Sequence, residues 1–133
     1  MSGIIGGAGS KSGVIGTTEL DYEEGTWTPK QDSSGTAFGG WGNGSYIKIG
    51  SNVNVWFDVQ NYDSNDPKIY NLPFTKDSVN PAGSCDINYQ ENVDSDVMGR
   101  INNDTTIITL NVGNSSPTVG SSSRMIGHAT YRV

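Results

Sequence analysis

The sequence predicts an all-β domain of short antiparallel strands, arranged as a β-sandwich of the jelly-roll kind. Several segments alternate apolar and polar residues with a period of two, which is the pattern of strands with one buried face. No window shows the 3.6-residue apolar spacing of an amphipathic helix. Turn-forming residues recur about every 8 to 12 positions between the alternating segments, as they do in sandwiches. These three observations together favour the all-β class.

The composition fits one folded domain with many turns. The chain has 133 residues, of which 18 are Gly, and only 33% are hydrophobic and 17% charged. Gly, Asn and Ser serve turn geometries, and Thr tolerates strands. Three Trp, six Tyr and three Phe lie in discrete clusters, which argues for a packed interior rather than a disordered chain.

The N-terminal residues 1–16 are rich in Gly and Ser and carry two apolar pairs, Ile4/Ile5 and Val14/Ile15. Gly costs about 1 kcal/mol at an interior helix position, so this segment cannot hold a helix by itself. Two interpretations stay open: a flexible arm, or an arm whose apolar pairs dock on neighbouring subunits. We therefore divide the chain into an arm, 1–16, for attachment or oligomer contact, and a single β-sandwich domain, 17–133.

The clearest predicted hairpin joins 45–49 to 52–60 through Gly50 and Ser51, a sequence that suits a two-residue type II′ turn. Along its second strand the apolar residues share one face, and the other face is polar apart from one tryptophan. The apolar face carries Val53, Val55, Phe57 and Val59, and the polar face carries Asn52, Asn54, Trp56 and Asp58.

Trp56 stands on a polar strand face and must be covered by something. The candidates are another sheet of the same chain, a neighbouring subunit or a ligand. We place Trp56 with Ile4, Ile5, Val14 and Ile15 among the candidate subunit contacts.

Three further strand regions are predicted toward the C-terminus. Cys85, Ile87 and Tyr89 have the spacing of one strand face. A second hairpin is expected from 96–101 and 105–112. The last segment, 124–133, alternates to its final residue, and a terminal strand tied into a sheet is often central in it. One face of this segment carries Met125, Gly127, Ala129, Tyr131 and Val133.

The sequence offers no catalytic or metal-binding constellation. Cys85 is the only thiol and His128 the only imidazole, and the alternation places Cys85 among apolar residues and His128 on a polar face. Zinc would need more such ligands. The acidic stretches 63–66 and 94–96 begin like calcium loops but lack the later ligands, so turns explain them. We expect no enzyme activity, no metal and no cofactor.

Charge and hydropathy argue against nucleic acid and membranes as partners. The net charge is −6 and the eight basic residues are scattered, so no basic stripe exists to bind nucleic acid. No apolar run approaches the roughly 20 residues of a membrane span, and no signal peptide is apparent, so we expect synthesis in the cytoplasm and no membrane insertion.

Aromatic residues among Asn, Asp and Gly suit sugar binding, because a ring stacks on a pyranose and amides or carboxylates take its hydroxyls. The candidate glycan-binding residues are Trp41, Tyr62, Asp63 and Asn65. The alternative for each ring is core packing, which we expect for Trp27.

Three segments carry a resemblance to a known family of domains. They are Asp21-Tyr22-Glu23-Glu24-Gly25-Thr26-Trp27-Thr28-Pro29, residues 44–50, and Asn71-Leu72-Pro73-Phe74-Thr75. Across residues 13–133 the chain resembles a recurrent domain of phage and prophage virion proteins, such as tail-fibre and head-fibre proteins. The resemblance implies a trimeric β-sandwich exposed on a particle and used for structure or host recognition. It implies no catalytic residue.

From these observations we expect a phage virion structural protein, either a fibre or appendage domain or a capsid decoration, that presents a surface for assembly or host recognition. The expected partners are two further copies of the chain, other virion proteins and, for a host-recognition surface, a glycan. The alternative function is a lectin-like module that binds a host receptor. The expected location is the virion.

Overall fold

The computed structural model describes residues 21–62, 66–79, 82–93 and 96–133, and it confirms the all-β prediction. These residues form eight strands and no helix, and all strand pairs are antiparallel. The strands are β1 (Tyr22–Trp27), β2 (Gly42–Ile49), β3 (Asn52–Gln60), β4 (Lys68–Ile69), β5 (Gly83–Glu91), β6 (Met98–Ile101), β7 (Ile108–Asn111) and β8 (Arg124–Arg132). The predicted arm, with Ile4, Ile5, Val14 and Ile15, lies outside the described residues.

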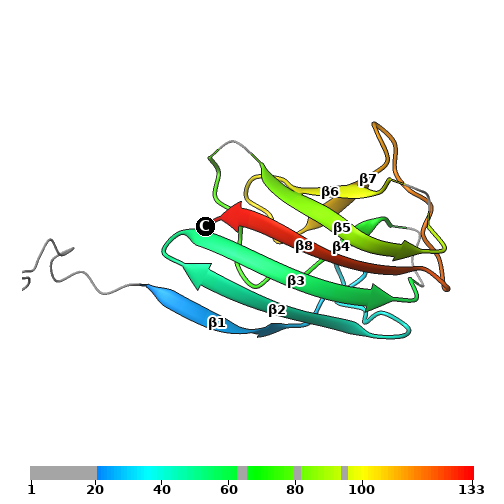
Figure 1. Cartoon of the computed structure of the whole chain (residues 1–133), viewed down its shortest axis with the longest axis horizontal. Helices are drawn as coiled ribbons and strands as arrows, with labels where there is room; N and C mark the ends of the chain where they lie inside the picture. Colours follow the sequence, from blue (N-terminus) through cyan, green and yellow to red (C-terminus); the bar gives the residue numbers. More distant parts are fainter. Residues whose placement is uncertain (1–20, 63–65, 80–81, 94–95) are drawn as a thin grey trace, which may run out of the picture.

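The strands belong to one sheet, in the order β1-β2-β3-β8-β5-β6-β7-β4, and not to the two packed sheets of the expected sandwich. β5 pairs with β8 on one side and β6 on the other, so the hydrogen bonding continues without a break. The sheet is twisted and curled into a half-barrel (Figure 1).

A bridge between Lys30 and Tyr70 shows how far the sheet curls. These residues follow the two edge strands, β1 and β4, and exchange backbone hydrogen bonds of 3.1 and 2.8 Å. In a flat sheet the edges would be about 34 Å apart, given roughly 4.8 Å between neighbouring strands. The curl therefore brings the two edges together at one end and encloses a single core.

The core lies on the inner face of the curled sheet. The four predicted apolar residues of β3 are buried, namely Val53, Val55, Phe57 and Val59. On β8, Met125 and Tyr131 face the same interior. Burying a side chain of this size contributes roughly 1.5 to 3 kcal/mol. Because side chains alternate between faces, a slip of one residue in register would expose the whole set.

The β2–β3 hairpin has the predicted turn. Gly50 has φ of 58°, and Ser51 is not among the residues with positive φ, which is the combination that a type II′ turn requires. β8 lies between β3 and β5, so the prediction of a central last strand is also confirmed.

The second predicted hairpin exists, but its strands are shorter than expected. β6 pairs with β7 from Met98 and Asn111 to Ile101 and Ile108. The carbonyls of Thr105 and Thr106, expected in the strand, accept hydrogen bonds from the backbone N–H groups of Lys76 and Leu72. These carbonyls thus tie the segment after β4 to the sheet instead of extending the hairpin.

The prediction that Tyr89 shares a face with Cys85 is wrong. A β-bulge between Ile87 and Tyr89 shifts the register of β5 against β8. Cys85 is buried, whereas Tyr89 is exposed on the opposite side of the sheet. The extra residue in a bulge reverses the alternation that follows it.

Glycines opposite large rings are a recurrent feature of the inner face. Trp27 pairs in register with Gly44, and a Cβ at Gly44 would lie 2.3 Å from the indole nitrogen of Trp27. Tyr46 covers Gly25 in the same way, with its hydroxyl 2.9 Å from a Cβ built there. A ring folded over a strand glycine shields the backbone that the glycine leaves open. The Gly25 to Trp27 part of the motif thus builds the core.

Candidate functional site

The outer face of the central strands carries a mixed aromatic and polar surface. Residues of β2, β3, β8 and β5 that point away from the core line up in register across this face. One row consists of Ser45, Trp56, His128 and Asp86, and the next of Asn43, Asp58 and Ile126. We call the surface formed by these seven residues, together with Trp41, Asn88, Tyr89 and Arg124, the outer face.

Trp56 lies near the centre of the outer face and is 41% exposed. Its only ring contact among the described residues is with His128, at 5.3 Å between centroids and 36° between planes. No second sheet of the described chain covers it. Of the three covers considered from the sequence, a neighbouring subunit and a ligand remain.

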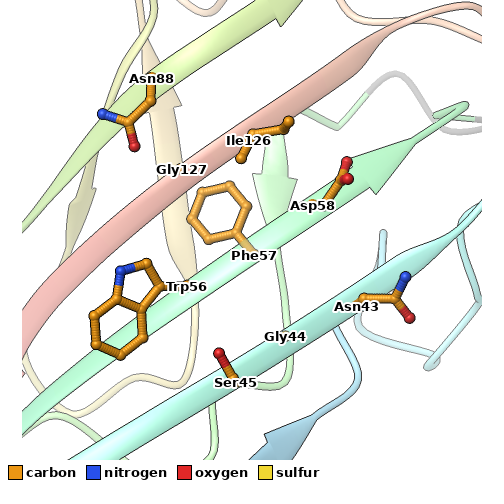
Figure 2. A pocket seen from close by; sticks show the side chains of 9 residues that line it. All are labelled: Asn43, Gly44, Ser45, Trp56, Phe57, Asp58, Asn88, Ile126 and Gly127. Atoms are coloured by element: carbon orange, nitrogen blue, oxygen red, sulfur yellow. The ribbon is translucent and has the colours of Figure 1, made fainter.

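An open hollow of about 390 Å³ lies beside Trp56 (Figure 2). Its floor is formed by Gly44, Phe57 and Gly127, whose backbones lie in register between the two outward rows. The side chains around it come from four strands and include an aromatic ring, an aliphatic chain, two amides, a hydroxyl and a carboxylate. They belong to Asn43, Ser45, Trp56, Asp58, Asn88 and Ile126.

A second aromatic cluster lies at the end of the outer face next to Gln60. The guanidinium of Arg124 lies 5.1 Å from the ring of Trp41 and 5.6 Å from the ring of Tyr89. It also donates two hydrogen bonds to Asp58, from Nε at 3.1 Å and from an Nη at 2.7 Å. The planar fork of arginine suits both a bidentate carboxylate and a stack on aromatic rings.

The ion pair sets the protonation of Asp58. Hydrogen bonding to Arg124 is the main cause that lowers the pKa of Asp58 below its ordinary value, with a smaller contribution from the Trp41 side chain. A lowered pKa in the folded state means that the pair stabilises the fold when Asp58 is ionised. This contribution is complete above the unfolded pKa of about 3.9 and is lost as the pH falls through the lowered value.

We therefore expect Asp58→Asn to be less stable than the wild type at about pH 6, and the difference to shrink as the pH approaches about 2. At low pH the wild-type carboxyl is itself neutral and resembles the amide. Thermal unfolding followed by circular dichroism at several pH values measures the difference. A gap that stays constant across the pH range would show that the charge on Asp58 contributes nothing.

Of the predicted glycan-binding residues that the structure describes, only Trp41 belongs to the outer face. Tyr62 is 1% exposed and packs edge-on against Phe38 at 4.8 Å, so its ring cannot stack on a surface sugar. Asp63 and Asn65, the other two predicted members of that glycan site, lie outside the described residues. Trp41 remains at the surface, 43% exposed, and Trp27 is buried as predicted.

Cys85 is buried, as expected of a structural cysteine, and burial raises its pKa to about 12. It is therefore protonated and unreactive near neutral pH. Within the described ranges, no group of three or more His, Cys, Asp and Glu side chains is placed to hold a metal ion. The described part of the chain also contains no helix long and apolar enough to span a membrane.

Comparisons with family models, with curated proteins and with solved structures give no match for this chain. The structural class of the chain is therefore described from its fold and its surface alone. The described chain is a curled, all-β, antiparallel half-barrel with its core on the inner face and an aromatic, hydrogen-bonding surface on the outer face.

Proposed function

We propose that this chain is a structural domain of a phage particle, a fibre or appendage domain or a capsid decoration, that presents its outer face for assembly or host recognition. The observation that carries the proposal is the outer face itself. The sheet holds Trp41, Trp56 and Tyr89 at more than 40% exposure on one surface. Exposed aromatic residues gathered on one surface are characteristic of binding sites.

The resemblance to phage virion domains supports the proposed location on a phage particle. Its most specific part, Glu24 to Pro29, contributes Trp27 and Pro29 to the buried interior. A motif that builds the core is suited to recur in domains with different surfaces, because core residues keep the fold while surface residues change. The proposed role is therefore binding and assembly on the exterior of the particle, without catalysis.

A lectin-like module is the second candidate function. The hollow beside Trp56 favours it, because it combines a ring with amide and hydroxyl groups. The two candidates are compatible, since a structural domain of a particle can also carry a sugar site.

We expect the purified chain to sediment with the mass of three subunits at micromolar concentration, and to be detected by antibody on particles released by the host of this phage. Removing residues 1–16 tests the proposed role of Ile4, Ile5, Val14 and Ile15. If the arm docks on neighbouring subunits, the truncated chain sediments as a smaller species.

Two results would contradict the proposal separately. A monomer of full-length chain at micromolar concentration would remove the trimer. Absence of antibody label from intact particles, with label in the soluble fraction of the same lysate, would remove the virion role.

A further inference from the structure

We propose that the hollow beside Trp56 is a binding subsite for a neutral saccharide, with the indole as its stacking platform. The inference rests on the proposed function and deepens it by naming the ligand class of the presented surface. The hollow, at about 390 Å³, falls within the roughly 300 to 1,000 Å³ typical of small-ligand sites.

The orientation of Trp56 suits stacking. Figure 2 shows its indole nearly face-on from the solvent side of the sheet, so a flat aromatic surface is turned outward. The ring is supported by His128 beside it and by the long β3 strand beneath it. A fixed ring loses little conformational entropy when a sugar ring binds on it, and one face of a pyranose is apolar enough to pack there.

The polar side chains around the hollow are available to a ligand. Asn43, Ser45 and Asn88 line the hollow, and their side chains make no hydrogen bond within the described structure. Each amide offers an acceptor oxygen and two donor hydrogens, and the hydroxyl offers both functions. Sugar hydroxyls need donors and acceptors together. Asn88 sits at the bulge of β5, between Ile87 and Tyr89, which brings its side chain to the rim of the hollow.

The charges favour a neutral ligand. Asp58 is already paired with Arg124, so this carboxylate and guanidinium cancel each other. Asp86 stands in register with His128 on the same face, and the chain carries a net charge of −6. An acidic sugar would meet uncompensated negative charge, whereas a neutral one would not.

The same chemistry disfavours a second copy of the chain as the cover of Trp56. The core of a protein–protein interface is depleted of charged residues. Burying this face against another copy would enclose Asp86 and the free amides, and each unpaired polar group costs free energy. A saccharide in the hollow offers hydroxyls to the amides of Asn43 and Asn88 and leaves Asp86, which is exposed and does not line the hollow, in water.

The test uses the full chain and a panel of immobilised oligosaccharides. Half of the panel is neutral, built from hexoses and N-acetylhexosamines, and half contains uronic or sialic acids. We expect binding to neutral members, quantified by titration of tryptophan fluorescence with the free sugar. Trp56→Ala should weaken the binding roughly tenfold or more, since loss of about 1.4 kcal/mol of stacking corresponds to a factor of ten.

Two further variants sharpen the result. Asn43→Ala combined with Asn88→Ala keeps the ring and removes the amides, and should also weaken binding. Met98→Ala is the matched control, because Met98 is an exposed apolar residue, 55% exposed, that does not line the hollow. It should leave the affinity unchanged.

Sedimentation of each variant shows whether Trp56 is a sugar-binding residue or a subunit contact. The proposal is overturned if no neutral sugar binds, if acidic sugars bind more tightly, or if Trp56→Ala binds as well as Met98→Ala. It is also overturned if Trp56→Ala lowers the oligomer mass, because the indole would then be a subunit contact. Antibody labelling of particles with the Trp56→Ala domain tests the virion role independently of sugar binding.

Discussion

Replacing Phe57 by alanine should lower the free energy of unfolding by about 3 to 5 kcal/mol, while replacing its neighbour Trp56 should lower it by about 1 kcal/mol. The two rings are adjacent in sequence but lie on opposite faces of β3. Phe57 is 2% exposed and packs against the backbone of Gly127, so its removal leaves a cavity that the sheet cannot close. Trp56 leaves only a larger hollow open to solvent.

Urea unfolding of the two variants, compared with the wild type, measures both values. If Phe57→Ala does not fold, Phe57→Leu supplies the smaller change. Equal losses for Phe57→Ala and Trp56→Ala would mean that the outer face is also buried, as it would be in a tight oligomer whose dissociation is coupled to unfolding.

Gly127→Ala should destabilise the fold by about 1 to 3 kcal/mol, although it adds a single methyl group. A Cβ at this position would lie 2.5 Å from Cζ of Phe57 and 2.7 Å from the backbone carbonyl oxygen of Asp86. The ring could give way only by leaving its place in the core, and the carbonyl belongs to the neighbouring strand.

Gly120→Ala is the matched control for this substitution. A Cβ at Gly120 would meet no atom within 4 Å, and the residue does not have a positive φ. We expect no loss, or a gain of up to about 1 kcal/mol, because alanine restricts the unfolded chain. Similar losses for the two glycines would refute the steric explanation.

The double variant Phe57→Ala/Gly127→Ala separates the two clashes. If the contact with the ring dominates, the double variant should be less destabilised than the sum of the single ones, since the added methyl then occupies part of the space left by the ring. Strict additivity would assign the cost to the Asp86 carbonyl instead.

Local alternation predicted the parts of this fold that depend only on neighbouring residues. The turn at Gly50 and Ser51, the buried face of β3 and the central position of β8 all agree with the structure. Each depends on a period of two that extends unbroken through a strand of eight or nine residues. The sheet as a whole was harder to predict, because its curl brings together residues far apart in the sequence, such as Lys30 and Tyr70.

The outer face could be predicted only in part, for a related reason. Trp56 was recognisable as a large ring on a polar strand face. Tyr89 was not, because a one-residue bulge leaves no clear mark in the sequence and reverses every side chain beyond it. Arg124 comes between Trp41 and Tyr89 only after that reversal. Composition also suggested turns for most glycines, whereas Gly25 and Gly44 stand inside strands beneath or beside aromatic rings, as does Gly127 in the predicted last strand.

The two edge strands of the curled sheet affect the solubility of the domain. An edge strand with free N–H and C=O groups is a template on which another molecule can add a strand and begin to aggregate. Here one edge, β4, has only two residues, and the other, β1, carries the adjacent carboxylates Glu23 and Glu24. Short and charged edges are two of the devices by which β-proteins avoid this pairing. The domain should therefore stay dispersed at high concentration, with its contacts directed through its faces rather than its edges.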